Sequence, residues 1–155
     1  MTVYLLPEEL VFPPVEEAEP DGLIAIGGDL SVHRLVQAYS HGIFPWFVEE
    51  KDFYWYSPDP RLVLFPDQFR IPESLQRIVK SNRFEVRFDT VFGQVIEACA
   101  QVARSVKGGT WISDEFIDAY SALHKLGFAH SVETFVNGKL VGGLYGVSIG
   151  AAFFG

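Results

Sequence analysis

The stretch HSVETFVNGKLVGGLYGV (His130–Val147) predicts a β-hairpin. Apolar and polar residues alternate before and after Asn137-Gly138. This dipeptide is a strong signal for a two-residue turn between antiparallel strands. The other helices and strands are therefore assigned starting from this hairpin.

The second predicted strand of the hairpin contains two adjacent glycines, Gly142 and Gly143. Glycines inside a strand indicate a bulge or the close approach of another backbone. The approaching group can belong to the fold itself, or it can be the main chain or acyl group of a substrate. Leu144 and Tyr145 should point to opposite faces, one toward a pocket and one toward the core.

The segments before the hairpin predict helices and strands in mixed order. Ser31, Asp89 and Ser113 are each suited to cap a helix, because a side-chain oxygen can accept from the free N–H groups of the first turn. We expect helices over 31–41, 72–81, 90–104 and 113–126, and strands over 53–57, 62–65, 84–89 and in the hairpin. This mixture predicts an α+β or mixed α/β fold. The boundary falls near residues 62–68, between an N-terminal module (residues 1–65) and a second module (residues 66–155).

The composition excludes several classes of protein. Hydrophobic residues make up 48% of the 155-residue chain, which is enough for a packed core. The net charge of −8 argues against non-specific binding to long DNA, which relies on many Lys and Arg contacts to phosphate. The N-terminus has neither a signal peptide nor a membrane span, so a cytoplasmic location is expected.

No arrangement of residues identifies a nucleophile or a metal centre. Cys99 is the single cysteine, and the four histidines lack metal-ligand spacing. There is no nucleophile elbow and no P-loop. This favours chemistry whose substrates arrive already activated.

The stretch GIFPWF (Gly42–Phe47) concentrates aromatic residues beside glycine and proline, which suits neither a helix nor a simple strand. Trp46 and Trp111 both stand in segments of this kind, where an irregular backbone tends to present a side chain. Each Trp either fills a core between two modules or forms a platform on which a base or sugar stacks. Tyr39 and Tyr120 each end an apolar stripe, as core tyrosines with a satisfied hydroxyl do.

Seven motifs occur in order along the chain: GGDLS, AYSHGIFPWF, WYSPDPR, FGQVIEACA, GTWIS, AYSALHKLGFAHSVE and LVGGLYGV. Together they resemble the leucyl/phenylalanyl-tRNA–protein transferase family, from about residue 22 to the end. The resemblance implies an N-terminal module of the family's own type. It also implies a second module, incomplete at its C-terminal end, that is similar to the GCN5-related acetyltransferase fold.

The resemblance implies an aminoacyltransferase of the N-degron pathway of protein degradation. Members of the family move Leu or Phe, and Met less well, from aminoacyl-tRNA to the N-terminal Lys or Arg of a protein. The new peptide bond marks that protein for degradation. Because an aminoacyl ester is already activated, no cofactor is implied. The expected partners are aminoacyl-tRNA and acceptor proteins, with no membrane and no DNA.

The resemblance also implies roles for individual residues. Trp46 and Trp111 match the tryptophans that hold the 3′-terminal adenosine of the tRNA. Leu144 stands where many relatives have Met in the pocket for the aminoacyl side chain. Tyr39, Tyr120 and Phe153 match aromatic positions near that pocket, and Gly155 begins the family's GESMFS motif. Within GIFPWF, we expect Phe44 and Phe47 to be buried anchors and the Trp46 ring to be exposed.

The catalytic residues stay unassigned. In the family, the pocket glutamate and the Asp and Gln of the peptide-bond step lie beyond the position of Gly155. The chain is therefore expected to be truncated and to lack transfer activity alone. Two alternatives are open. An acyl-CoA-dependent N-acyltransferase would need a glycine-rich pyrophosphate loop after the last strand. A non-catalytic module would bind RNA ends or basic N-terminal peptides without transfer.

Overall fold

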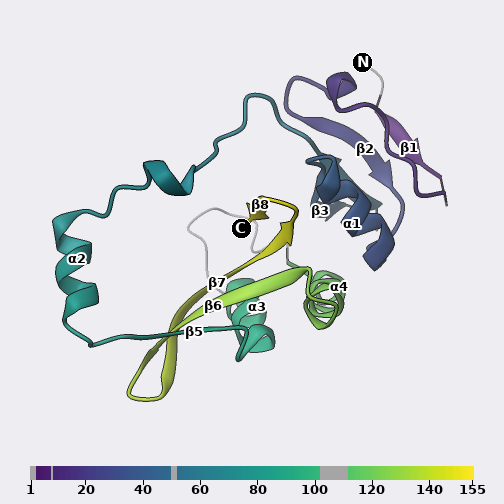
Figure 1. Ribbon diagram of the computed structural model, residues 1–155. Coiled ribbons are helices and arrows are strands. Elements are labelled where there is room, and N and C mark those ends of the chain that lie inside the picture. The colour runs from purple at the N-terminus through teal and green to yellow at the C-terminus, as the bar shows by residue number, and fades with distance from the viewer. Residues whose placement is uncertain (1–2, 8, 50–51, 102–111) are drawn as a thin grey trace.

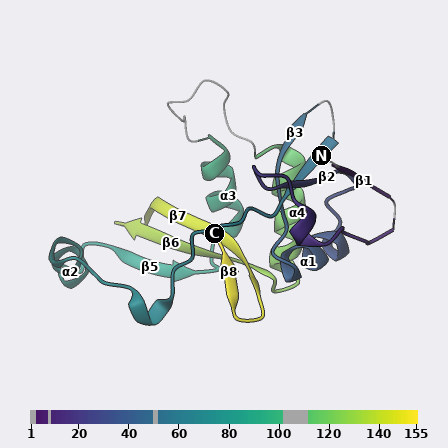
Figure 2. The same cartoon turned by 90° about the horizontal axis from the view of Figure 1, so that it is seen from above.

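The computed structural model describes residues 3–7, 9–49, 52–101 and 112–155, without the side chains of residues 47–49. The strands that it describes form two four-stranded sheets, and helices α1, α3 and α4 pack against them (Figures 1 and 2). The predicted α+β class is confirmed. The likeness to the acetyltransferase fold and the division into modules 1–65 and 66–155 stay predictions.

The first sheet has the order β1-β2-β4-β3. Its strands are β1 (Tyr4–Leu6), β2 (Leu23–Gly27), β3 (Phe44–Glu49) and β4 (Asp52–Tyr56). β1 pairs with β2 in parallel, and the other pairs are antiparallel. A short 3-10 turn, η1 (Val15–Glu17), lies in the arm between β1 and β2.

Helix α1 (Val32–Ser40) starts where the sequence predicts, because the Ser31 hydroxyl accepts from the Arg34 N–H. Its inner face buries Leu35, Ala38 and Tyr39, as expected. The helix also buries Arg34 completely. The Arg34 guanidinium donates to the carbonyls of Pro7 and Glu9, which fixes the N-terminal arm on the body of the protein.

Two of the predictions for residues 42–65 are wrong. GIFPWF contributes a strand, β3, which is at the edge of its sheet. Pro45 is tolerated there because an edge strand pairs on one side only, and the register shifts between Pro45 and Val48. Residues 62–65, predicted as a strand, have no strand partner and are largely exposed. They lead through η2 (Pro66–Gln68) to α2 (Glu73–Lys80), an exposed helix that lies apart from both sheets (Figure 1).

The second sheet is antiparallel throughout and has the order β5-β6-β7-β8. Its strands are β5 (Glu85–Phe88), β6 (Ala129–Val136), β7 (Lys139–Ile149) and β8 (Ala152–Phe154). The hairpin prediction is confirmed. Asn137 and Gly138 have φ values of 49° and 74°, as the two central residues of a tight hairpin turn require.

Helices α3 (Phe92–Gln101) and α4 (Asp114–Lys125) lie on one face of the second sheet (Figure 2). Gly143 allows this packing, because a Cβ there would lie 3.1 Å from the Val95 side chain of α3. The close approach predicted for the glycine pair is therefore a contact within the fold at Gly143, whereas a Cβ at Gly142 would make only an ordinary contact, 3.9 Å from the Thr134 Cβ.

The predicted caps of α3 and α4 are wrong in their details. Asp89 does not cap α3; it has φ +56°, and its carboxylate accepts instead from the Ser131 N–H of β6. The buried carboxylate of Glu133 accepts from the Thr90 and Val91 N–H groups just before α3. Ser113 is the N-cap residue of α4, but its side chain makes no capping hydrogen bond.

One hydrophobic core joins the two sheets. It contains Ile24, Leu35 and Trp55 from the first half of the chain, and Phe116, Leu123 and Val147 from the second. None of the helices in the described residues is long and apolar enough to cross a membrane.

Candidate functional site

Trp46 lies on the edge strand β3 and is 48% exposed. Its ring meets Tyr56 edge-on, with centroids 5.4 Å apart, and Phe44 at a tilt, with centroids 6.3 Å apart. One side of the indole is thus held by protein while the rest is open to solvent. This geometry suits the stacking of a planar group, which contributes about 1–3 kcal/mol per base.

The expected anchors of this platform need revision. Phe44 is only half-buried, and Ile43 and Pro45 are the buried residues on either side of it. The side chain of Phe47 and the whole of Trp111 lie outside the described residues. The pairing of Trp46 with Trp111 in one site therefore stays a prediction.

Tyr39 of α1 and Tyr120 of α4 meet through their hydroxyl groups, whose oxygens are 2.5 Å apart. Both side chains are buried. Burial raises the pKa of Tyr39 to about 12, against a smaller lowering by the hydrogen bond to Tyr120. Burial likewise raises the pKa of Tyr120 well above its ordinary value. Both hydroxyls are therefore neutral and satisfied, as the core interpretation of these tyrosines requires.

Strands β7 and β8 pack against this tyrosine pair. The Phe154 ring meets Tyr39 with centroids 5.1 Å apart, and the Tyr145 ring meets Tyr120 with centroids 5.7 Å apart. The pair thus connects helix α1, which follows the first sheet's β2, to the last two strands of the second sheet. It fixes where the exposed side chains of those strands lie.

Leu144 and Phe153 are on the face of the second sheet that α3 and α4 do not cover, and they are 48% and 51% exposed. Tyr145 points to the opposite face and packs on Phe92, so the prediction that Leu144 and Tyr145 point to opposite faces is confirmed. That Leu144 faces a pocket stays a prediction. The Phe153 ring lies over Gly146, where an added Cβ would lie 2.5 Å from its Cζ atom. Gly155 is next to the same ring. The structure therefore groups Phe153 and Gly155, with Leu144 two residues from Gly146 on the same face.

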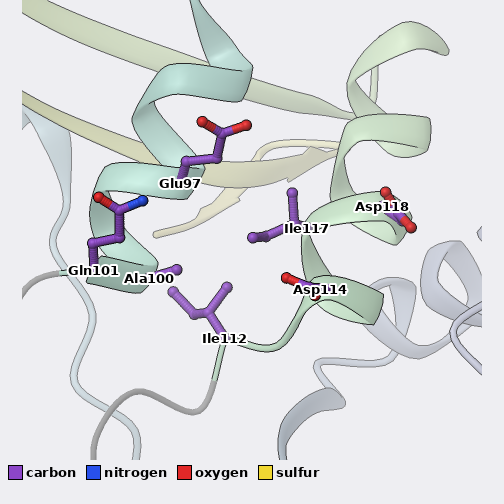
Figure 3. A pocket seen from close by; sticks show the side chains of 7 residues that line it. All are labelled: Glu97, Ala100, Gln101, Ile112, Asp114, Ile117 and Asp118. Carbon is purple, nitrogen blue, oxygen red and sulfur yellow. The ribbon is translucent and has the colours of Figure 1, made fainter.

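A cleft of about 360 Å³ opens between α3 and α4 (Figure 3). Its lining includes the carboxylates of Glu97, Asp114 and Asp118, together with Gln101 and Ile112. Residues 102–111, which join the two helices in sequence, lie outside the described residues. No pattern in the sequence indicates this cleft, because its acidic residues belong to different helices and share no motif.

A polar cluster just before α3 is likewise not predicted by any local pattern in the sequence. The Asp89 carboxylate is 2.8 Å from Nδ1 of His130 and 3.8 Å from Nδ1 of His124. Burial raises the pKa of Asp89, but hydrogen bonds from His130 and the Ser131 N–H outweigh it and leave the pKa below its ordinary value. Within the described ranges, no group of three or more His, Cys, Asp or Glu residues is arranged to hold a metal ion. The cluster fixes the turn between β5 and α3 to strand β6.

Comparisons with known proteins agree with the motif resemblance. The model of the leucyl/phenylalanyl-tRNA protein transferase family matches residues 63–155, and the model of that family's N-terminal domain matches residues 28–59.

Three similar curated proteins are named leucyl/phenylalanyl-tRNA–protein transferase. The one from Syntrophobacter fumaroxidans is 54% identical over 100% of this chain and 66% of its own length. The one from Aromatoleum aromaticum is 59% identical over 93% of this chain and 61% of its own length. The one from Thermodesulfovibrio yellowstonii is 55% identical over 100% of this chain and 63% of its own length. The chain thus spans less than two thirds of the length of these relatives.

Proposed function

Because the chain belongs to the leucyl/phenylalanyl-tRNA protein transferase family, we propose that it serves the transfer of Leu or Phe, and less well Met, from aminoacyl-tRNA to a protein. The acceptor is the α-amino group of an N-terminal Lys or Arg. The product is a substrate for protein degradation, and the reaction belongs in the cytoplasm, where charged tRNA is used.

The transfer reaction requires few catalytic groups from the protein. The α-amine has an ordinary pKa of about 7.7–8.0, so a useful fraction is neutral near pH 7. Its nitrogen attacks the ester carbonyl, the bond to the ribose oxygen breaks, and a proton moves to that oxygen. Rate enhancement then comes from positioning the two substrates and stabilising the oxyanion. No nucleophilic side chain and no cofactor is needed.

The described residues divide this work between two places. We assign the terminal adenosine to the Trp46 platform, with Trp111 as its partner. We assign the aminoacyl side chain to the surface around Leu144, Phe153 and Gly155. Tyr39 and Tyr120 are buried behind this surface, so within the pocket assignment they act by positioning β7 and β8.

The observation that carries the proposal is the half-exposed Trp46 ring, held by Tyr56 and Phe44, in a chain of this family. It can be tested with a stable amide analogue of 3′-phenylalanyl-adenosine and calorimetry. Trp46→Ala should weaken binding by about ten- to one-hundredfold, because it removes one stacked base. Trp46→Phe should restore part of the affinity.

Phe69→Ala is the matched control, because Phe69 is 52% exposed and lies in the segment before α2. It should leave the dissociation constant unchanged. Equal binding by wild type and Trp46→Ala would overturn the assignment of the adenosine to Trp46.

A further inference from the structure

A second cavity, of about 330 Å³, lies where the end of α1 meets the segment after β4. Its polar lining comes from Glu16 of η1, His41 at the end of α1, and Ser57, Asp59 and Arg61 after β4. Arg61 ends the motif WYSPDPR, to which the sequence analysis gave no role.

The Arg61 guanidinium is held in place from two sides. Its Nη2 donates to the Gly42 carbonyl at 2.6 Å. Its central carbon lies 5.4 Å from the centroid of the Phe44 ring, in a cation–π contact. In the described part of the chain, the guanidinium has no other hydrogen bond and no ion pair. Its remaining donors are thus pre-positioned for a ligand.

The cavity also offers acceptors. Glu16 and Asp59 have no side-chain hydrogen bond or ion pair with any other residue that the structure describes. The His41 Nδ1 donates to the Gln37 carbonyl at 2.9 Å, so in the neutral ring Nε2 is left as an acceptor. A phosphate in this cavity would meet two carboxylates as well as the guanidinium. A group with both acceptors and an amino donor would match the lining better.

The cavity adjoins the Trp46 platform. The Phe44 ring contacts Arg61 and also contacts Trp46. Ser57 directly follows Tyr56, whose ring meets Trp46 edge-on. A single strand of RNA whose last base stacks on Trp46 therefore has this cavity beside it for the preceding nucleotide.

We propose that this cavity binds the nucleotide before the terminal adenosine and reads its base as cytosine. This inference rests on the proposed function. Cytosine presents N3 and O2 acceptors, which suit the Arg61 donors, and an N4 amino group, which suits a carboxylate such as Asp59 or Glu16. Uracil reverses the pattern at positions 3 and 4, so it would place its O4 against a carboxylate. Since every mature tRNA ends in cytosine-cytosine-adenosine, the cavity selects the common end of all donors.

The test uses three stable 3′-phenylalanyl-amide probes, which end in adenosine, in cytidylyl-adenosine or in uridylyl-adenosine. Dissociation constants are measured by calorimetry on the 155-residue chain. Wild type should bind the cytidine probe about tenfold more tightly than the uridine probe, as expected for one matched base contact. Arg61→Gln should abolish this preference and leave the adenosine probe within about twofold of wild type.

Arg61→Lys keeps the charge but loses the planar guanidinium donors. It should therefore lack the preference for the cytidine probe over the uridine probe, as Arg61→Gln does. Asp59→Ala and Glu16→Ala identify which carboxylate accepts from N4, and at least one of them should reduce the preference. Unchanged binding of the adenosine probe shows that each variant is folded.

Two results would overturn the inference. One is equal binding of the cytidine and uridine probes by wild type. The other is an equal loss for both probes in Arg61→Gln that Arg61→Lys restores, which would identify a phosphate contact. In both cases binding of the adenosine probe, and with it the proposed function, would survive. Failure of wild type to bind any of the three probes would overturn the inference and the proposed function together.

Discussion

The two faces of the second sheet are built from the same strands, but one face is buried under helices and the other is exposed to solvent. On the face covered by α3 and α4, β6 buries Ala129, Ser131, Glu133 and Phe135 in alternate positions. On the other face, the side chains are exposed to solvent: Val86 and Phe88 of β5, Leu144 of β7 and Phe153 of β8. The residues assigned to the aminoacyl pocket come from the open face. The buried polar groups come from the covered one.

The difference shows what each face can tolerate. Every polar group on the covered face needs a hydrogen-bond partner. A buried donor or acceptor without a partner destabilises the folded state, because it has lost its hydrogen bonds to water. On the open face, solvent can solvate whatever a substitution exposes. Changes on the covered face should therefore alter folding, and changes on the open face should alter ligand preference.

The largest effect is expected at Glu133. Its buried carboxylate accepts from the Thr90 N–H, the Thr90 hydroxyl, the Val91 N–H and the Ser131 hydroxyl. Glu133→Ala leaves these donors unpaired and should lower the free energy of unfolding by about 3 kcal/mol. For a chain of this length, the midpoint of thermal unfolding should fall by roughly 6–12 °C.

Glu97→Ala is the matched control, since Glu97 is an exposed carboxylate at the cleft between α3 and α4. It should change stability by no more than about 0.5 kcal/mol. Similar losses in the two variants would show that Glu133 is not a special acceptor and would remove the contrast between the faces.

The sequence predicts these elements unevenly, and Glu133 shows why. The hairpin at Asn137-Gly138 and the cap at Ser31 depend on neighbouring residues, so local patterns identify them correctly. The acceptor for the start of α3 comes from a strand more than 40 residues away, as the sequence separation of the Thr90–Glu133 hydrogen bond shows. Asp89 is the local candidate for that role, and β6 binds it instead. Contacts of this range have no local signature.

The candidate site follows the same rule. The glycine and proline around Trp46 leave both a core role and an exposed platform open, and only the motif resemblance predicts an exposed ring, which the structure shows. The sequence does not predict the β3 strand that carries Trp46, because proline is tolerated in a strand only at special positions such as the edge of a sheet. The sequence alone does not show that Pro45 is in an edge strand. In the sequence, Arg61 is only the last residue of the motif WYSPDPR, and nothing there predicts a role for it. Its importance comes from the Gly42 carbonyl and the Phe44 ring, which the fold brings to it.

A smaller effect is expected at the tyrosine pair that supports β7 and β8. Tyr120→Phe removes one hydroxyl and leaves the buried Tyr39 hydroxyl without its partner. The free energy of unfolding, measured in urea, should fall by about 1–2 kcal/mol. Tyr39→Phe/Tyr120→Phe together should cost less than the sum of the two single changes, because no unpaired hydroxyl is left. Additive losses would show that the two hydroxyls do not act as a pair.

The pH dependence of stability should come partly from Asp89. Hydrogen bonds from His130 and the Ser131 N–H outweigh burial and lower its pKa in the folded protein below the ordinary 3.8. The folded state therefore binds this proton less readily than the unfolded state. The stabilisation is present above pH 3.8 and is lost as the pH falls through the lower, folded value.

Urea unfolding between pH 3 and pH 7 tests this pH dependence. Asp89→Asn should flatten the acid side of the stability curve, whereas Asp118→Asn, at the open cleft, should leave its shape unchanged. A wild-type curve as flat as that of Asp89→Asn would contradict the role of the Asp89 carboxylate.

The smallest effect on stability, and the most specific effect on function, is expected at Leu144. Leu144→Met conserves volume at a half-exposed position of the open face and should change the free energy of unfolding by less than about 0.5 kcal/mol. Methionine is unbranched and adapts its shape. The ratio of dissociation constants for leucyl- and phenylalanyl-adenosine amides should therefore shift by about two- to fivefold. Val86→Ala, on the same face but two strands away, should leave the ratio unchanged. If Leu144→Met and Leu144→Ala both leave the ratio and the affinities unaltered, Leu144 lies outside the pocket, and the open face loses its assigned role.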